Sequence, residues 1–327
     1  QELQELLLKV PNVPHSSVPE TEPIIVREWG KPKEFTFKPR DHIDLGAILN
    51  ILDFQRGAKV AGSHFPCYKG EGAQLERALI NFMLDFHIQR HSYTEIFPPF
   101  LVNRTSMTGT GQLPKLEDDM YLCERDDLFL NPTGEVPITN LHRDEILPAN
   151  RLPIKYTGYT ACFRREAGSY GKDTRGLTRV HQFNKVEMVR FALPEESYND
   201  LEELLREAEE ILQALELHYR VVLLPANDLS FASTKTYDIE VWAPGLGRYL
   251  EVSSVSNFEE FQARRANIRI RRRQGAKPEY PHTLNGSGVA TPRTMIAILE
   301  TYQNEDGTIS VPKVLQPYLG EKEIIGG

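Results

Sequence analysis

Two short segments joined by a polar, glycine-rich loop carry charges that could bind a polyphosphate. The first covers residues 163–166 (Phe-Arg-Arg-Glu) and the second covers residues 179–183 (Arg-Val-His-Gln-Phe). The loop between them contains Lys172, Asp173 and Arg175. The planar guanidinium group of arginine can pair with two phosphate oxygens at once. The pattern therefore favours a hairpin that wraps a polyphosphate, although an exposed hairpin with solvated charges would have the same composition.

A second stretch, residues 284–295, combines glycines with an arginine at the start of a predicted helix. Gly286 and Gly288 would let the backbone come close to a ligand. Arg293 falls in the first helical turn, where the helix dipole favours an acidic side chain. A phosphate bound at the same helix start would explain this cation. The alternative is an arginine whose stem packs locally while its head reaches solvent.

A third stretch, residues 248–257, places acidic and hydroxyl side chains along a predicted strand. Strand alternation puts Glu251 and Ser253 on one face, and it puts Ser254 on the other face unless the strand bulges. Carboxylate and hydroxyl oxygens are hard ligands that suit magnesium bound with a nucleotide. An ordinary strand end followed by a serine-rich turn would look the same.

The elements that must hold these segments follow from hydrophobic periodicity. Apolar residues at helical spacing predict amphipathic helices over 73–91 and 200–215, and a last helix from Thr291 to Tyr302 with Pro292 in its first turn. Residues 93–97 predict a strand that ends at two prolines, which is typical of a sheet edge. Further strands are predicted at 126–130, 154–163, 180–191, 219–224, 236–242 and 248–254. Strands without regular helices between them favour an α+β fold with a largely antiparallel sheet.

Composition limits the classes of function. The 327 residues include 38 Lys plus Arg and 46 Asp plus Glu, for a net charge of −8, so any RNA would be bound by a local patch or with help from elsewhere. The densest basic run is residues 264–273, which could partly serve the fold. Neither a signal peptide nor a membrane-spanning run is recognisable.

The three cysteines, Cys67, Cys123 and Cys162, form no Cys-x-x-Cys pair. Their odd number argues against a disulfide framework and favours a reducing, cytoplasmic compartment. A zinc site built from them with His64 or His91 is not expected.

In this order and spacing, the segments resemble the three signature motifs of class II aminoacyl-tRNA synthetases. Residues 73–99 resemble motif 1, residues 163–183 motif 2, and residues 286–302 motif 3. Within that class, the chain is similar to the seryl-tRNA synthetase family over residues 11–326. That similarity rests on residues 11–19 (PNVPHSSVP), 109–115 (GTGQLPK), 173–177 (DTRGL), 181–183 (HQF), 261–265 (FQARR) and 284–287 (LNGS).

The resemblance implies a role for each matching residue. Arg164 and Arg293 match the catalytic cations, and Glu251 with Ser254 match the magnesium contacts. The implied ATP-binding set is Arg164, Arg165, Glu166, Arg179, Val180, Phe183, Glu251, Val252, Ser253, Ser254 and Arg293. The implied serine-binding set is Thr133, Gly134, Glu135, Arg164, Glu187, Asn285 and Ser287.

The resemblance also implies an activity. A member of this family activates L-serine with ATP, with Mg²⁺ as cofactor, to give seryl-adenylate and then transfers serine to tRNA(Ser); it acts as a homodimer. Residues 1–22 then form the remnant of a helix and a linker, and residues 23–327 form the class II catalytic domain. Gly134 stands where the family commonly has alanine, and Val255 where it commonly has cysteine.

The family's N-terminal coiled-coil arm, which contacts tRNA, has no counterpart in this sequence. We therefore expect transfer to tRNA to be weakened, whether the arm was removed or never present. Two alternatives remain open. One is a related ligase that loads an amino acid onto a carrier protein, which should show altered serine contacts. The other is a non-catalytic paralogue acting as a binding module, which should have lost Arg164 or Arg293.

Overall fold

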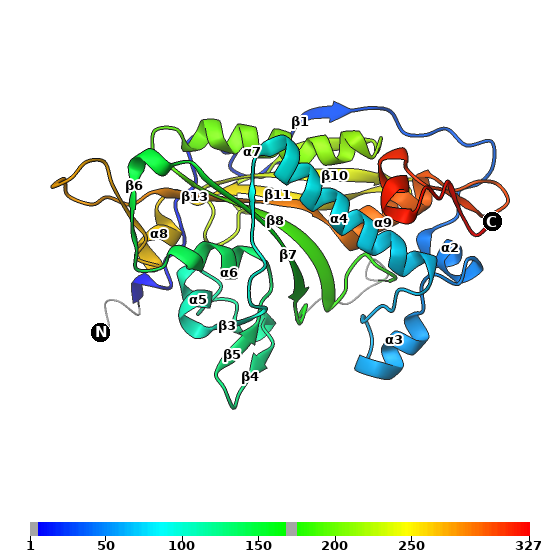
Figure 1. The fold of residues 1–327 in the computed structure, drawn as a ribbon, viewed down its shortest axis with the longest axis horizontal. Coiled ribbons are helices and arrows are strands. Elements are labelled where there is room, and N and C mark those ends of the chain that lie inside the picture. The colour runs from blue at the N-terminus through cyan, green and yellow to red at the C-terminus, as the bar shows by residue number, and fades with distance from the viewer. Residues whose placement is uncertain (1–5, 168–174) are drawn as a thin grey trace.

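An eight-stranded sheet forms the centre of the computed structural model, which describes residues 6–167 and 175–327 (Figure 1). Each pair of neighbouring strands is antiparallel except β2 and β7, which are parallel. In spatial order the strands are β1 (Ile24–Trp29), β9 (Tyr219–Leu223), β10 (Lys235–Ala243), β11 (Arg248–Asn257), β13 (His282–Ala290), β8 (Gln182–Ala192), β7 (Ile154–Phe163) and β2 (Thr94–Glu95). The predicted α+β class with a largely antiparallel sheet is confirmed.

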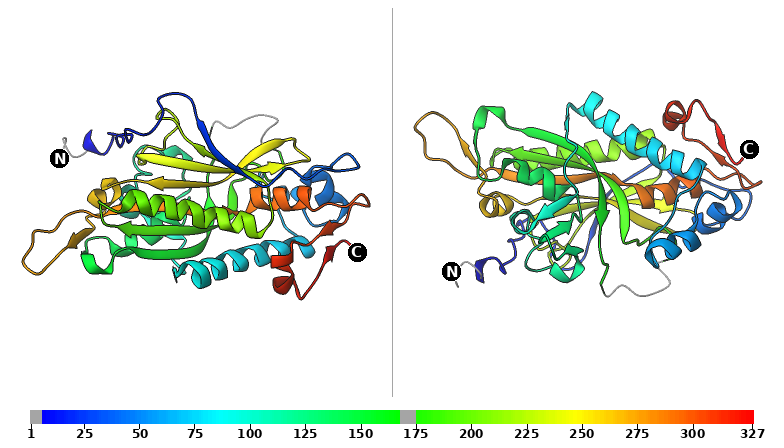
Figure 2. Two further views of the ribbon diagram at one scale, coloured as in Figure 1. Left: turned by 90° about the horizontal axis from the view of Figure 1, so that it is seen from above. Right: turned by 60° about the horizontal axis from the view of Figure 1, so that its bottom comes forward.

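Three helices cover one face of this sheet: α4 (Glu71–His91), α7 (Ser197–Ala214) and α9 (Thr291–Thr301) (Figures 1 and 2). Helix α4 contacts both α7 and α9. Each of the three predicted long helices is confirmed to within three residues at either end. Their apolar stripes and the facing strand residues form one buried cluster, which includes Leu79 of α4, Leu204 of α7 and Ile296 of α9. Burial of this apolar surface is the main force that holds the layers together.

Smaller elements surround the sheet. Among the described residues the short α-helices are α2 (His42–Ile48), α3 (Phe54–Ala61), α5 (Arg104–Gly109), α6 (Glu135–Thr139) and α8 (Phe261–Arg265). The short strands are β3 (Leu101–Asn103), β4 (Leu122–Cys123), β5 (Leu128–Leu130), β6 (Ile146–Pro148), β12 (Arg269–Arg271), β14 (Ile309–Ser310) and β15 (Ile324–Ile325). The 3₁₀ turns are η1 (Glu117–Asp119), η2 (Asn140–His142), η3 (Ala149–Arg151) and η5 (Lys313–Leu319). None of the helices in the described ranges is long and apolar enough to cross a membrane.

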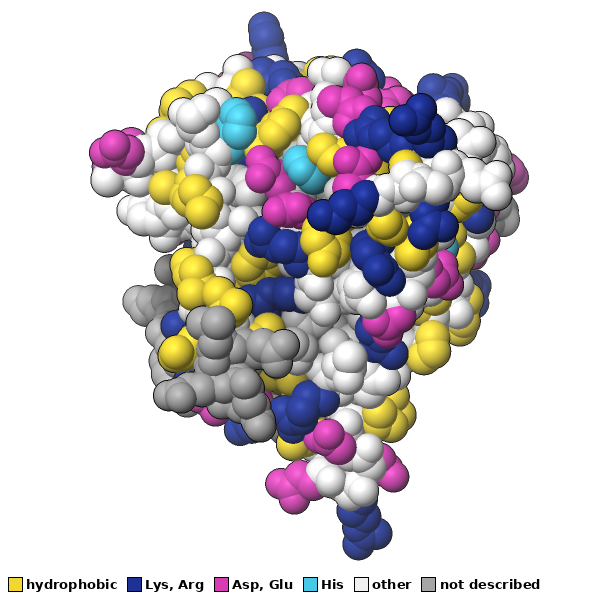
Figure 3. Space-filling view, turned by 90° about the vertical axis from the view of Figure 1, so that its left-hand side faces the viewer, with side chains coloured by type: hydrophobic (Ala, Val, Ile, Leu, Met, Phe, Trp, Pro, Cys, Tyr) yellow, Lys and Arg dark blue, Asp and Glu magenta, His cyan; other side chains and the backbone are white. Residues whose placement is uncertain are grey.

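The basic run at residues 264–273 lies at the end of the molecule that faces the viewer in Figure 3, where cationic and acidic side chains alternate. Arg264 pairs with Glu260 at 2.7 Å, and Arg272 pairs with Glu195 at 2.6 Å. The guanidinium of Arg265 lies 4.2 Å from the centre of the Phe261 ring. Much of this run therefore serves the fold.

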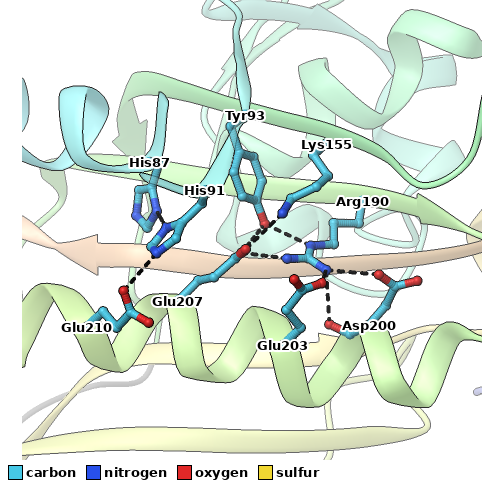
Figure 4. A network of polar contacts seen from close by, with 9 residues as sticks. All are labelled: His87, His91, Tyr93, Lys155, Arg190, Asp200, Glu203, Glu207 and Glu210. Atoms are coloured by element: carbon cyan, nitrogen blue, oxygen red, sulfur yellow. Dashed lines mark hydrogen bonds and ion pairs between the residues drawn. The ribbon is translucent and has the colours of Figure 1, made fainter. Parts of the chain in front are cut away.

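A fully buried arginine joins α7 to the sheet (Figure 4). The side chain of Arg190 in β8 is 0% exposed. Its guanidinium pairs with Asp200 at 2.9 Å, Glu203 at 2.6 Å and Glu207 at 2.6 Å, all three on α7. Its Nε donates a 2.8 Å hydrogen bond to the hydroxyl of Tyr93. Three carboxylates and one hydroxyl group therefore surround the positive charge of Arg190.

The same network continues to helix α4. Lys155 Nζ donates to Glu207 at 2.8 Å, and His91 Nε2 lies 3.0 Å from Glu210. His87 Nδ1 lies 3.0 Å from His91 Nδ1. Burial, together with the nearby His91 and two further cations, lowers the pKa of His87 to about 3, so His87 is neutral at physiological pH. Helices α4 and α7 are therefore linked through polar side chains as well as through apolar packing.

We expect Arg190→Met to lower the free energy of unfolding by about 3–5 kcal/mol, because it leaves buried carboxylates without their counterion. A matched control is Arg272→Met, which breaks exposed ion pairs with Glu195 and Glu279. That change should cost less than about 1 kcal/mol. Urea unfolding of the two variants measures the difference. Equal losses in both would contradict a structural role for the Arg190 network.

Candidate active site

A cavity of about 530 Å³ opens on the face of the sheet that α4, α7 and α9 leave free. On β11, Ser254 and Ser256 line the cavity, whereas Val255 between them packs in the cluster under the helices. The predicted residues that line it are Thr133, Glu135, Arg164, Glu166, Arg179, Val180, Phe183, Glu251, Val252, Ser254, Asn285, Ser287 and Arg293. The fold thus brings most of the proposed ATP and serine contacts together.

Four predicted residues do not line the cavity. Arg165 is exposed, and its backbone N–H donates to the carbonyl of Asp119 at 2.9 Å. Gly134, Glu187 and Ser253 lie behind the wall. Lys172 and Asp173 of the predicted basic loop fall outside the described residues.

The prediction that Glu251 and Ser253 share a face is wrong, because strand β11 bulges. Ile239 pairs with Ser253 but Glu240 pairs with Glu251, which leaves Val252 as an extra residue. Glu251 and Ser254 consequently share a face, with 3.4 Å between Ser254 Oγ and Glu251 Oε1. Ser253 is fully buried on the opposite face and donates to the carbonyl of Ser287 at 2.7 Å.

Three guanidinium groups line the cavity. Arg293 Nη1 donates to the backbone carbonyl of Glu251 at 2.8 Å and to its carboxylate at 2.9 Å. Arg179 pairs with Glu166 at 2.6 Å. The guanidinium of Arg164 lies 5.3 Å from the centre of the Phe183 ring, and its Nε donates to the carbonyl of Pro132 at 3.2 Å. Cations and an exposed aromatic face in one cavity are suited to a nucleotide polyphosphate.

Asp238 lies next to Ser254 and was not among the residues predicted from the sequence. It pairs with Ser254 across the strands, and the Ser254 hydroxyl donates to its carboxylate at 2.6 Å. Burial and the nearby charge of Glu251 raise the pKa of Asp238 to about 7. Burial alone would raise the pKa of Glu251, but the positive charges of Arg293 and Arg164 have the larger effect. The pKa of Glu251 is therefore lowered. Only the register between β10 and β11 could have identified Asp238.

The oxygens of Glu251, Asp238 and Ser254 form a hard donor set. Within residues 6–167 and 175–327, no three or more His, Cys, Asp or Glu side chains are grouped so that they alone could hold a metal.

Glu187 lies behind the cavity wall and holds two of its lining residues in place. It is 0% exposed and accepts hydrogen bonds from Thr133 at 2.6 Å and Asn285 at 3.1 Å. Lys185 Nζ lies 2.6 Å from its carboxylate and donates to the Thr133 hydroxyl at 2.8 Å. Lys185 lines the cavity and was not among the predicted site residues. Its spacing of two from Glu187 on a strand was the available signal.

Glu135, in contrast, lines the cavity itself at the start of α6. Its side chain is mostly buried and receives a hydrogen bond from Gln262, which sequence reasoning also missed. Burial first, and then the charge of Glu187, raise the pKa of Glu135 to about 7. We call the part of the cavity wall at Glu135 the acidic end of the cavity.

A buried carboxyl group on α4 connects two walls of the cavity. Glu76 accepts hydrogen bonds from the side chain of Asn184 at 2.8 Å and from the hydroxyl of Thr291. Asn184 follows Phe183 in β8, and Thr291 begins the helix that carries Arg293. Burial raises the pKa of Glu76 to about 7 although both hydrogen bonds oppose the shift.

Comparisons with known proteins agree on one group of enzymes. Residues 121–302 match the family described as tRNA synthetase class II core domain (G, H, P, S and T). The serine–tRNA ligase of Geobacillus sp. (strain WCH70) is 63% identical over 329 residues, which covers 99% of this chain and 78% of that protein.

Solved structures give the same result. The seryl-tRNA synthetase from Pyrococcus horikoshii, complexed with ATP, aligns with a TM-score of 0.95 and 42% identity over 99% of this chain and 77% of that one. The cytoplasmic serine–tRNA ligase from Naegleria fowleri, in complex with AMP, aligns with a TM-score of 0.92 and 34% identity over 99% of this chain and 78% of that one.

The carboxyl group of Glu76 makes stability depend on pH in a testable way. Its pKa rises from 4.5 to about 7 on folding, so the folded chain binds more protons than the unfolded chain in that window. Stability therefore falls as pH rises from 4.5 to 7. Glu76→Gln removes this loss, and its free energy of unfolding relative to wild type should rise by about 1–3 kcal/mol between pH 5 and pH 8.

Urea unfolding at the two pH values measures this change. The exposed Glu124→Gln variant is the matched control and should leave the pH dependence of wild type unaltered. A constant difference between Glu76→Gln and wild type at both pH values would show that the Glu76 carboxyl group is not perturbed.

Proposed function

Because this chain belongs to the serine–tRNA ligase family of class II aminoacyl-tRNA synthetases, we propose that its cavity binds ATP and L-serine, joins them as seryl-adenylate and passes the serine to tRNA(Ser). It is an ATP-dependent ligase. The observation that carries the proposal is that three guanidinium groups and the Glu135 carboxyl group line one cavity. The carrier-protein ligase and the non-catalytic paralogue gain no support from the relatives, which are serine–tRNA ligases across 99% of this chain.

The chemistry needs positioning more than proton transfer. The carboxylate of serine is already ionised and attacks the α-phosphorus of ATP, and pyrophosphate leaves in line. Arg164 stabilises the charge that develops on the α-phosphate, and Arg293 and Arg179 hold the outer phosphates. Phe183 offers its ring for stacking on adenine, and the backbone of Val180 is available to the adenine edge. Ion pairs with Glu251 and Glu166 restrain the side chains of Arg293 and Arg179.

We infer that Glu251 and Ser254, with Asp238 beside them, would hold Mg²⁺ together with the nucleotide. Their hard oxygens fit this ion, which keeps several waters and binds proteins through one or two carboxylates. When bound, Mg²⁺ supplies neutralisation of phosphate charge.

Selection of serine follows from the acidic end of the cavity. Glu135 faces the cavity and accepts hydrogen bonds from the donors that serine carries, while Glu187 holds Thr133 and Asn285 in place. A site built around hydrogen bonds to a hydroxyl rejects analogues that lack it, because its buried polar groups would be left unpaired. Alanine and glycine should be poor substrates, and threonine should be excluded by size.

We also propose a cytoplasmic location. The three cysteines are free, and Cys67 is exposed. Exposed free thiols fit a reducing compartment. ATP and tRNA are available as substrates in the cytoplasm.

Serine-dependent exchange between ATP and pyrophosphate tests the proposed reaction. Arg164→Ala and Arg293→Ala should each lower the exchange rate by about a hundredfold, or about 3 kcal/mol, since each loses a charge-assisted contact in the transition state. Arg165→Ala is the control, because Arg165 is adjacent in sequence but exposed outside the cavity, and it should stay within about threefold. All variants should unfold at the same urea concentration as wild type. Wild-type exchange that threonine, alanine or glycine supports as well as serine would refute the assignment.

We further propose a homodimer formed through the edge of the sheet at β2. Phe97, which follows this two-residue strand, is 77% exposed. Its ring lies 5.8 Å from that of Phe100 and 6.5 Å from that of Tyr159, measured between centroids. An exposed aromatic group beside an open strand edge favours a two-fold contact that covers both.

Light scattering at micromolar concentration should give twice the monomer mass of 37.3 kDa. Phe97→Asp should shift the protein toward monomer, because it would bury a charge in the contact. Val60→Asp on α3 changes a side chain that is 87% exposed elsewhere and should leave the mass unchanged. A wild-type protein of 37.3 kDa would refute the dimer.

A further inference from the structure

Gln262 lies one layer behind the acidic end of the cavity. It belongs to the short helix α8, is 1% exposed and does not line the cavity. Its side chain nevertheless touches three separate parts of the chain. Nε2 donates to the carboxylate of Glu135 and, at 3.3 Å, to the backbone carbonyl of Thr110, while Oε1 accepts from the hydroxyl of Thr283 at 2.8 Å.

These partners leave the carboxamide only one orientation. The carbonyl oxygen of Thr110 can accept a hydrogen bond but cannot donate one, so the NH₂ group of Gln262 must face it. The same NH₂ group then also faces Glu135. Thr283, which is 0% exposed, completes the arrangement by donating to the opposite side of the amide. Gln262 is therefore held as a donor toward Glu135.

The hydrogen bond from Gln262 affects the protonation of Glu135. Its side chain is 7% exposed, and burial together with the charge of Glu187 raises its pKa to about 7. Gln262, Lys185 and Arg164 act in the opposite direction and favour the ionised form. A protonated carboxyl group accepts a hydrogen bond from an ammonium group much less well than a carboxylate does. The balance at Glu135 thus controls whether the acidic end can receive the ammonium and hydroxyl donors of serine.

We propose that Gln262 is a positioning residue for amino-acid selection, which holds the Glu135 carboxylate as an acceptor at the edge of the cavity. This proposal rests on the proposed function, since it takes serine as the ligand of that end. Gln262 does not touch substrate and acts through Glu135 alone. A purely structural role for Gln262, as a link between α8, β13 and the loop at Thr110, makes a different prediction. It would weaken folding and would affect ATP and serine alike.

The experiment compares Gln262→Met with wild type in pyrophosphate exchange from pH 6 to pH 9. Methionine matches glutamine in length but has no N–H donor. In wild type, the KM for serine should fall as pH rises through about 7, where Glu135 ionises. In Gln262→Met, the KM for serine at pH 7 should rise at least about tenfold, and its fall should move to higher pH by about one pH unit. The KM for ATP should stay within about twofold.

Thr283→Val is the matched control. It removes the hydrogen bond to Gln262 Oε1 but keeps the donor to Glu135, so the KM for serine should change by less than about threefold. If Gln262→Met does not fold, Gln262→Asn replaces it. Asparagine keeps the carboxamide but is one methylene shorter, and it should show the same rise in the KM for serine.

An unchanged KM for serine in a folded Gln262 variant would overturn the positioning role while leaving the proposed function intact. Equal increases in the KM for ATP and serine, with a lower urea midpoint, would assign Gln262 a structural role instead. A wild-type protein without serine-dependent exchange would overturn the proposed function itself, and the inference about Gln262 with it.

Discussion

Strand β8 must satisfy two different environments on its two faces, and the arrangement of the site depends on this constraint. Phe183 and Lys185 line the cavity, and Glu187, at a position of the same parity, lies behind its wall and bonds to Thr133. Asn184 and Arg190, whose positions have the opposite parity, meet Glu76 of α4 and the acidic row of α7. A charge as deeply buried as that of Arg190 is tolerated only with its partners in place. The ion network therefore holds α7 on β8, and it fixes the strand that carries the site.

Three cations of the cavity form ion pairs with acidic side chains. Arg293 forms an ion pair with Glu251, Arg179 with Glu166, and Lys185 with Glu187. These ion pairs restrain the charged side chains, and restrained charges favour electrostatic preorganisation of the site.

Two buried side chains behind the cavity wall, Glu76 and Gln262, connect separate parts of the site. Glu76 joins Asn184 to Thr291, and so relates the aromatic wall at Phe183 to the start of the helix that carries Arg293. Gln262 plays the corresponding part at the acidic end. In both cases a carboxyl group with a raised pKa lies next to an amide donor, so small changes in these contacts alter protonation as well as position.

The local sequence was sufficient to predict the helices over 73–91, 200–215 and 291–302 and six strands of the central sheet, but not β1 and β13. These depend on periodicity and on short segments that the chain keeps together. The sequence could not predict that Val252 bulges, which exchanges Ser253 for Ser254 on the cavity face. It could not show that Glu187 lies behind the wall while Glu135 faces the cavity, or that Asp238 and Gln262 join the site. Gln262 is 127 positions from Glu135, and Asp238 meets Ser254 through strand register. Such contacts depend on how separate elements pack, and only the tertiary structure determines them.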